Sequence, residues 1–464
     1  MSDNINKNLI LGSPWEYLPD EIVTDIFLRL PIKSIIICTS VSKTWKSLIQ
    51  NPTFISNHLH HSYTTTTNNH NLLLISSHNK ELYCALHNED DPYFSKHTRF
   101  DCHPALGSSN GLLYLVGTCN GLLCLSNTYD INRFFLLNPS GRKFVELPLP
   151  NVTLHNYFEP SLGFGYDSKT NDYKVVRAVS LKLMEDSCVF QNPQPPVVEV
   201  YSLSTGQWKM LSAPVCVVLY GNCQKQAFVN GALHWLASRI TTTNDGKNKV
   251  HFVLVLDLGD EVFHEILLPE SLQYDLCTSV SVYGNSIAMF QSDSYDCILN
   301  IWVMKEYGVA SSWMKVHQNR TLSILRAVGF RRNGEVVLQM FSGGRLVSWN
   351  PESQKIKELR IIGFSFTFVG YYVENLVLLD KTANGAVTYR RKSEASVVEL
   401  MKSTNGVLFW DVSFFRGVRT RELEAMSGFM DTIYGSSVRG FGKDKMCWKP
   451  DIDKGFMVKD YYSI

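Results

Sequence analysis

The sequence predicts a mainly β protein in which a β-propeller of about six blades follows a small N-terminal α-helical domain. Between residues 72 and 380, short runs rich in Val, Ile, Leu, Phe and Tyr alternate with Gly, Asn, Asp and Pro, as strands alternate with turns. Hairpins of similar form also recur there at a nearly regular interval. A pair of β-sandwiches is the alternative, because the Gly-Gly and Trp signatures of strong repeats are largely missing.

The composition is that of a globular protein working inside the cell. Apolar residues make up 45% of the 464 residues and charged residues 19%, a balance typical of packed domains. The net charge of +1 argues against long-range attraction to nucleic acid or to an anionic membrane. The N-terminus is polar, and no apolar run approaches the roughly 20 residues that cross a bilayer. We therefore expect a cytoplasmic or nuclear protein with no nucleic-acid or membrane partner.

The eleven cysteines are expected to be reduced, because their number is odd and their spacing is irregular in a large chain. Cys119 and Cys124 form the closest pair and should lie on neighbouring apolar strands. Their spacing is not that of zinc ligands.

Residues 1–14 are expected to be disordered, and the first helix should begin near Pro19. A proline in the first turn followed by Asp20 and Glu21 specifies a helix N-terminus. Pro31 should end this helix, and a second helical run follows over residues 32–49. Two such short helices cannot bury all their aliphatic side chains against each other. Some of these side chains must meet another surface. Apolar residues recur at helical spacing in the first helix, namely Ile22, Val23, Ile26, Phe27 and Leu30.

Residues 15–61 resemble the F-box, the helical motif that binds a Skp-type adaptor within cullin-based SCF ubiquitin ligases. The second helix reads Ile36-Ile37-Cys38-Thr39 where the family commonly has basic and aromatic residues. The alternative is a helical hairpin that packs only on its own protein. The resemblance assigns adaptor binding to the residues that match the motif, which are Leu18, Pro19, Ile22, Ile26, Leu30, Pro31, Val41 and Trp45.

Residues 54–61 are expected to add a short helix, and residues 62–71 to form a polar linker. The propeller should then occupy residues 72–380. Asn-Gly pairs at Asn110, Asn120, Asn230 and Asn333 supply the positive-φ residues of tight hairpins.

Each expected blade pairs two hairpins. The turns of the second hairpins are about 45 to 65 residues apart, close to the period of kelch-type blades. The leftover strands, within residues 72–86 and 366–379, should pair to close the ring, because an open edge would expose unpaired backbone groups. The expected first hairpins are 109–125, 161–179, 227–237, 280–290 and 327–341, and the second hairpins are 134–150, 198–211, 252–269, 299–316 and 345–361.

Several segments of this region are similar to the F-box-associated domain found in a large group of plant proteins. They include GTCNGLLCL, LLNPSGRKFVELP, GFGYDSKTNDYKVVR, VEVYSLSTGQWK and FVNGALHWLA. With the F-box, the similarity covers about residues 15–380. Residues 381–464 depart from this pattern, and the run KMCWKPDIDKGFMVKDYY is similar to peptides of retroelement-derived plant reading frames. One hypothesis is that this divergent extension was appended; the alternative is a genuine extension that packs on the propeller.

No catalytic, cofactor or metal site is predicted. His58, His60 and His61 cluster without an acidic or cysteine partner at fixed spacing, so a solvated face is expected. His234 lies in an expected strand and is interpreted as a core histidine. Gly163-Phe164-Gly165 lacks the third glycine and the following helix of a phosphate loop.

The resemblance implies a non-catalytic substrate-recognition subunit of an SCF ubiquitin ligase. Its F-box would bind the Skp-type adaptor and, through it, a cullin, while the propeller would bind a target protein. The long polar loops at 181–196 and 240–249 are candidates for target binding. The alternatives are an F-box scaffold without ligase output, and a propeller that acts as a binding module or lectin.

Overall fold

The structure is a computed structural model of the chain. It describes residues 19–65 and 71–378, apart from 79–80, 89–90, 92–93, 95–96, 101–112, 129, 153–157, 182–195, 214–217, 220–225, 244–245, 273–276, 294–297, 320–323 and 365. Beyond residue 378 it describes residues 387–388, 401–404, 407–410, 447–448 and 460–462. The chain divides into two compact units, Met1–Arg29 with Arg390–Ile464, and Leu30–Tyr389. The predicted disorder of residues 1–14 lies outside the described residues.

The first unit contains helix α1 (Asp20–Arg29) and a small sheet from the C-terminal extension. Asp20 and Glu21 occupy the first turn of α1 and Arg29 the last, an arrangement that complements the helix dipole. The strand order of the sheet is β27-β28-β30-β29. Its strands are β27 (Met401–Thr404), β28 (Val407–Trp410), β29 (Cys447–Trp448) and β30 (Asp460–Tyr462).

The second unit begins with three helices, α2 (Ile32–Cys38), α3 (Lys43–Ile49) and α4 (Pro52–Thr65). The prediction of one helix over residues 32–49 was wrong. Ser42 is extended and its side chain accepts a hydrogen bond from the Trp45 backbone N–H at 3.0 Å, so it caps a new helix. Helix α4 continues to Thr65, within the segment expected as a linker.

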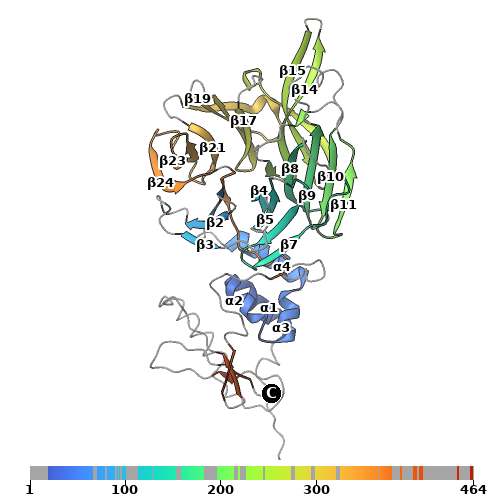
Figure 1. The fold of residues 1–464 in the computed structure, drawn as a ribbon, viewed down its shortest axis with the longest axis vertical. Helices are drawn as coiled ribbons and strands as arrows, with labels where there is room; N and C mark the ends of the chain where they lie inside the picture. The colour runs from blue at the N-terminus through green and yellow to red at the C-terminus, as the bar shows by residue number, and fades with distance from the viewer. Residues whose placement is uncertain are drawn as a thin grey trace, which may run out of the picture. The chain divides into compact units, whose positions relative to one another are not determined.

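Six antiparallel sheets follow and surround a common centre as the blades of a propeller (Figure 1). Blade 1 has the order β25-β1-β2-β3, and blades 2 to 6 follow in chain order. Blade 1 contains β1 (Asn71–His78), β2 (Glu81–Asn88), β3 (His97–Phe100) and β25 (Phe368–Tyr371). Blade 2 contains β4 (Leu113–Cys119), β5 (Leu122–Asn127), β6 (Phe134–Asn138), β7 (Lys143–Glu146) and β26 (Val387–Thr388). Blade 3 contains β8 (Phe158–Asp167), β9 (Asp172–Leu181), β10 (Val197–Ser202) and β11 (Gln207–Leu211).

The remaining blades have the same antiparallel plan. Blade 4 contains β12 (Val218–Leu219), β13 (Ala227–Val229), β14 (Ala232–Thr243), β15 (Gly246–Asp257) and β16 (Val262–Leu267). Blade 5 contains β17 (Cys277–Tyr283), β18 (Ser286–Asp293), β19 (Ile298–Met304) and β20 (Trp313–Asn319). Blade 6 contains β21 (Ile324–Phe330), β22 (Val336–Met340), β23 (Arg345–Trp349) and β24 (Ile356–Ile362). Short 3₁₀ turns η3 (Glu270–Leu272) and η4 (Ala310–Ser312) lie before β17 and β20.

The ring closes as the sequence predicts, since strands from its two ends pair in blade 1. Leu72 lies opposite Tyr371 and Ile75 opposite Phe368. Strand β1 thereby gains a partner on each side, β2 and β25. The prediction of a propeller of about six blades is confirmed, and the β-sandwich alternative is excluded.

The core consists of the layers between blades. Strand β15 is buried on both faces, as its unbroken apolar run predicts. Phe252, Leu254 and Leu256 pack with blade 3 residues, whereas Val253 and Val255 pack with blade 5 residues. The side chains of one strand alternate between its two faces, so a single strand contributes to two adjacent layers.

The antiparallel plan gives the propeller two distinct faces. Turns that join the first strand of a blade to the second, and the third to the fourth, lie on one face. Helix α4 lies there, because the Tyr63 hydroxyl donates to Asn120 Oδ1 at 3.0 Å in the β4–β5 turn. We call this the helix face. The loop face is the opposite one, where the second strand of a blade is joined to the third.

Candidate functional site

Helix α1 presents two different apolar faces. Val23 and Phe27 are 7% and 1% exposed, whereas Ile22 and Ile26 are 48% and 38% exposed. Each pair is four residues apart and therefore lies along one side of the helix. Val23 and Phe27 belong to the protein interior, whereas Ile22 and Ile26 remain accessible on the surface.

The α2–α3 region of the second unit shows the same separation. Ile32, Ile35 and Cys38 of α2 are buried, whereas Ile37 is 67% exposed. Val41, in the turn after α2, is also exposed. Ile37 is not among the predicted adaptor-binding residues. Ile37 lies two residues after Ile35 and one residue before Cys38, so it is not on the helix face that those two residues bury. This spacing is the signal by which Ile37 could have been found from the sequence.

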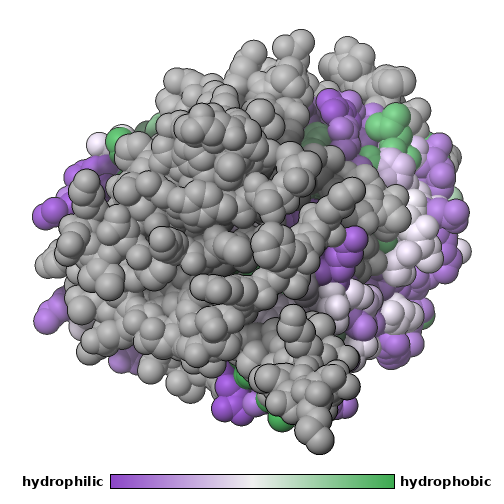
Figure 2. Space-filling model, turned by 90° about the horizontal axis from the view of Figure 1, so that it is seen from below, coloured by the Kyte–Doolittle hydropathy of each residue, from purple (hydrophilic) through white to green (hydrophobic). Residues whose placement is uncertain are grey.

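The other predicted adaptor-binding residues have varied surroundings. Pro19 is exposed just before α1, and Pro31 is exposed at the N-cap of α2. Leu30 and Trp45 are half-buried. Leu18 lies outside the described residues. The described part of the surface seen in Figure 2 is mainly hydrophilic, with small separate hydrophobic areas.

Helix α4 connects the helical region to the propeller. Asn120 accepts from Tyr63 and donates through Nδ2 to the Tyr173 hydroxyl at 3.2 Å, which links α4 to strand β9. Within α4, His58 is buried, so the expectation that the histidine cluster forms a solvated face was wrong for this member. Burial and the nearby His61 lower the pKa of His58 to about 4, although a hydrogen bond with the Leu30 backbone opposes this. The neutral His58 side chain therefore connects α4 to Leu30, just before α2, through this hydrogen bond.

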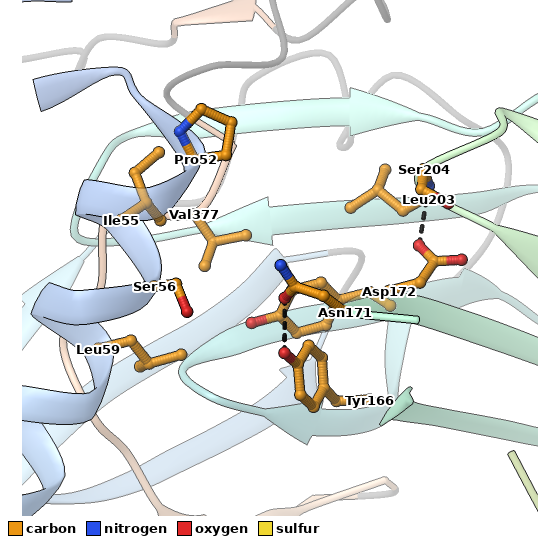
Figure 3. A pocket seen from close by; sticks show the side chains of 11 residues that line it. Pro52, Ile55, Ser56, Leu59, Tyr166, Asn171, Asp172, Leu203, Ser204 and Val377 are labelled. Atoms are coloured by element: carbon orange, nitrogen blue, oxygen red, sulfur yellow. Dashed lines mark hydrogen bonds between the residues drawn. The ribbon is translucent and has the colours of Figure 1, made fainter. Parts of the chain in front are cut away.

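A cavity of about 140 Å³ lies between α4 and blade 3 (Figure 3). Ile55 and Leu59 form an apolar wall, opposite the polar side chains of Asn171 and Asp172. These polar groups already have partners. The Tyr166 hydroxyl donates to Asn171 Oδ1 at 2.6 Å, and Asp172 accepts from the Ser204 backbone N–H at 2.8 Å. The cavity therefore shows the packing of α4 on the propeller and no arrangement for catalysis.

Several buried charges in the propeller are paired between neighbouring elements. Lys174 lies 3.0 Å from Asp167 and 3.2 Å from Glu261, which connects blades 3 and 4. Burial alone would raise the pKa of Asp167, but hydrogen bonds from Thr170 and Lys174 outweigh it and hold this pKa below its usual value. Such satisfied pairs stabilise blade contacts. In the parts of the chain that the structure describes, no group of three or more His, Cys, Asp or Glu side chains is placed to hold a metal ion.

Two other sequence-based interpretations are confirmed. His234 is buried, with Nδ1 3.1 Å from the Ala227 carbonyl oxygen. Cys119 and Cys124 lie on the adjacent strands β4 and β5 as buried free thiols. Burial raises the pKa of both thiols well above the usual value, so they are poor nucleophiles.

One expected target-binding loop is instead part of a hairpin. Residues 240–243 belong to β14 and residues 246–249 to β15, with Ile240 opposite Lys249 and Thr243 opposite Gly246. The run of Ile240 and three threonines favours strands because these residues are β-branched. The prediction of a loop at 240–249 was wrong. Of the other candidate, residues 182–195 lie outside the described residues.

Comparison with known families divides the chain into the same two regions, the N-terminal helices and the propeller. Residues 15–57 match the F-box domain, and residues 64–338 match the F-box associated beta propeller domain. The chain belongs to this F-box propeller family. Proteins of this family are typically non-catalytic adaptors. The F-box domain implies that the chain binds a Skp-type adaptor, whereas the family match does not identify a target protein.

Similar plant proteins match this F-box protein over most of their length. F-box protein CPR1 of Arabidopsis thaliana is 28% identical over 422 residues, which cover 83% of this chain and 96% of CPR1. F-box/kelch-repeat protein At3g23880 of the same plant is 27% identical, with 70% of this chain and 86% of that protein covered. The similarity therefore spans both the F-box and the propeller.

Among the described helices of this F-box protein, none combines the length and the hydropathy needed to span a membrane.

Proposed function

We propose that this F-box protein is a substrate-recognition subunit of an SCF ubiquitin ligase. Its F-box helices bind a Skp-type adaptor and, through it, a cullin, and its propeller binds a target protein for ubiquitination and degradation. The reaction takes place on other subunits. This chain contributes proximity, because it holds the target near the ubiquitin-charged enzyme. The protein acts in the cytoplasm, the nucleus or both.

The exposed side of α1 carries the proposal. Ile22 and Ile26 remain exposed although Val23 and Phe27 on the same short helix are buried. Full burial of an aliphatic side chain stabilises a complex by roughly 1.5 to 3 kcal/mol. Because Ile22 and Ile26 are 48% and 38% exposed, burying the rest of both side chains is worth about 1.3 to 2.6 kcal/mol. Since 1.4 kcal/mol corresponds to about tenfold in affinity, the two isoleucines together are expected to contribute about tenfold to seventyfold.

The test is adaptor co-purification with the double variant Ile22→Ser, Ile26→Ser. Both side chains are exposed, so the protein should fold while its adaptor affinity falls by about tenfold or more. The matched control is Val262→Ser, Leu267→Ser, which removes two exposed aliphatic side chains from β16 and should leave adaptor binding unchanged. Undiminished adaptor recovery with the α1 variant contradicts the proposal.

Ligase output is measured separately from docking. A target that co-purifies under proteasome inhibition should accumulate when cullin neddylation is blocked, because its degradation then stops. If the cullin co-purifies but bound proteins keep the same half-life, the chain is a scaffold without ligase output.

A further inference from the structure

The outer edge of blade 2 is covered by a strand from the end of the second unit. In the order β26-β7-β6-β5-β4, strand β26 lies outside β7, the fourth strand of the blade. In the other five sheets of the propeller, as far as the structure describes them, the fourth strand is the outermost one. An outermost strand presents unpaired backbone N–H and C=O groups to which a further strand can bind. Strand β26 therefore shows that the edge of β7 accepts an added strand.

Strand β26 is held on this edge by few contacts. On its inner side, β7 pairs with β6 through all four of its residues. On its outer side, the described pairing consists of Val387 opposite Phe144 and Thr388 opposite Lys143. Two residue pairs offset little of the entropy that is lost when a backbone segment is fixed. A longer strand that bound the same edge would therefore displace β26.

The β6–β7 turn beside this edge is fixed by hydrogen bonds. Asn138 Nδ2 donates to Asn375 Oδ1 at 2.8 Å and to the Val377 carbonyl oxygen at 2.6 Å. Asn138 Oδ1 accepts from the Gly141 N–H at 2.9 Å. The start of β7 is thus presented in one position, which lowers the entropy lost when a strand binds there.

Two positive charges without partners lie at this edge. Lys143, in β7, is 8% exposed, and Lys46 belongs to helix α3. Burial lowers the pKa of Lys143, and the nearby charge of Lys46 lowers it further. Among the described residues, neither ammonium group has an ion pair or a hydrogen bond, and no carboxylate is among the causes of this shift. Two neighbouring ammonium groups without a carboxylate favour a negatively charged ligand.

The chain's own strand does not supply that negative charge. Residues 381–393, which include β26, contain no Asp or Glu. Three basic residues come soon after β26 in the sequence, namely Arg390, Arg391 and Lys392. Strand β26 thus pairs with the backbone of β7 but leaves the two lysines without a counter-charge. A strand with carboxylate side chains would satisfy both.

We propose that the outer edge of blade 2 binds an extended acidic segment of the target protein by strand addition, in the place that β26 occupies. The backbone of β7 pairs with the target strand, and Asp or Glu side chains of that strand lie next to Lys143 and Lys46. Strand β26 covers the edge until a target binds. This inference rests on the proposed function, since it identifies the kind of target segment that the propeller holds.

The experiment uses the full chain purified with its Skp-type adaptor and a phage-displayed library of random peptides of about 12 residues, which is long enough for one strand. The selected peptides are expected to be rich in Asp and Glu. The double variant Lys46→Gln, Lys143→Gln should weaken their binding severalfold at low salt and less at about 0.5 M salt, since salt screens exposed charges.

A second variant tests the displacement of β26. Val387→Pro with Thr388→Pro removes both backbone N–H groups of β26 and should detach this strand from β7. Because the apparent affinity is proportional to the fraction of chains whose edge is open, this variant should bind the selected peptides at least about threefold more tightly. Peptide binding should also slow hydrogen exchange at residues 143–146 of this variant.

The matched control is Lys305→Gln, Lys355→Gln, which removes exposed lysines from the corresponding connections between the third and fourth strands of blades 5 and 6. It should bind the selected peptides like the parent. The inference is overturned by no enriched peptide, by a basic consensus, by equal binding of the Lys46, Lys143 variant, or by unchanged affinity of the proline variant. Adaptor recovery is measured in each preparation, so a failure of the proposed function is distinguished from a failure of peptide binding.

Discussion

Arg177 and Glu199 form an ion pair in which neither side chain is exposed to solvent. Arg177 Nη1 donates to Glu199 Oε2 at 2.8 Å and to the Val152 carbonyl oxygen at 2.9 Å, and Nη2 donates to Asn132 Oδ1 at 2.8 Å. The guanidinium therefore joins blade 3 to the β5–β6 connection of blade 2. A buried charge of this kind is tolerated because its partner and hydrogen bonds offset the loss of hydration.

Removing only one member of this pair should be costly. Arg177→Met leaves Glu199 charged and buried, so the free energy of unfolding should fall by about 3 to 5 kcal/mol. The double variant Arg177→Met, Glu199→Leu should recover much of that loss, as measured by denaturant unfolding. Arg345→Ala, which breaks an exposed pair with Glu358, should change stability by less than about 1 kcal/mol. Equal effects of Arg177→Met and Arg345→Ala contradict this account.

His234 should make the propeller sensitive to acid. Its Nδ1 donates to the Ala227 carbonyl oxygen, so Nε2 accepts from the Tyr307 hydroxyl at 2.8 Å and the ring is neutral. Burial lowers the pKa of His234 to about 4, below its ordinary value of 6.5. Below pH 6.5 the unfolded chain therefore binds a proton at His234 that the folded chain does not bind. The free energy of unfolding is greatest above pH 6.5 and decreases as the pH falls toward 4.

The measurement is the free energy of unfolding as a function of pH. His234 should contribute a loss of about 3 kcal/mol between pH 6.5 and 4. His234→Gln should reduce the steepness of this dependence, although buried His58 retains its own share. His60→Gln, on the exposed side of α4, serves as the control and should follow the parent. An unchanged pH dependence in His234→Gln contradicts the assignment.

Among the structural elements, the β4–β5 turn depends most on its glycine. Asn120 and Gly121 have φ of 51° and 74°, as the two central residues of a type I′ hairpin require. A Cβ atom on Gly121 would lie 1.8 Å from the Val373 carbonyl oxygen, in the segment that follows β25. The turn therefore needs glycine for its conformation and for the close approach of another backbone.

Gly121→Ala should destabilise the propeller by about 2 kcal/mol or more, because it adds backbone strain and a steric clash. The control is Gly231→Ala, which has φ of 77° but open space around its Cβ position, so it carries the strain alone. In thermal unfolding, the melting temperature should decrease more for Gly121→Ala than for Gly231→Ala. If the melting temperature decreases equally in both variants, the close approach of the Val373 backbone to Gly121 does not contribute to the loss of stability.

Hairpins and paired helices were predictable from the sequence to different degrees. Hairpins with an Asn-Gly turn between apolar runs were predicted because a local turn signal and a period of two agree, as in β4–β5. The division of residues 32–49 into α2 and α3 was missed because the Ser42 cap competes with continuous helical spacing. The burial of His58 and the exposure of Phe341 depend on residues distant in the sequence, which spacing alone does not reveal.

At the scale of the molecule, the propeller should be independent of the C-terminal extension but not of β25. A chain ending at Tyr389 retains the complete second unit, so its melting temperature should stay within about 2 °C of the parent. A chain ending at Phe364 lacks β25 and leaves one edge of β1 unpaired. It should lose cooperative unfolding and aggregate, as calorimetry and size-exclusion chromatography would show. A cooperative transition at the parent temperature in the shorter chain contradicts this role of β25.

The pairing of β1 with β25 also has a consequence during synthesis. Strand β1 leaves the ribosome about 300 residues before β25, which at about 5 to 20 residues per second amounts to about 15 to 60 s. Helices α1, α2 and α3 precede this interval in the chain. A nascent or prematurely terminated chain therefore carries these helices while its ring is still open. If the proposed function holds, such a product competes for adaptor without carrying a target, so messenger stability and chaperone supply influence how many ligase complexes are productive.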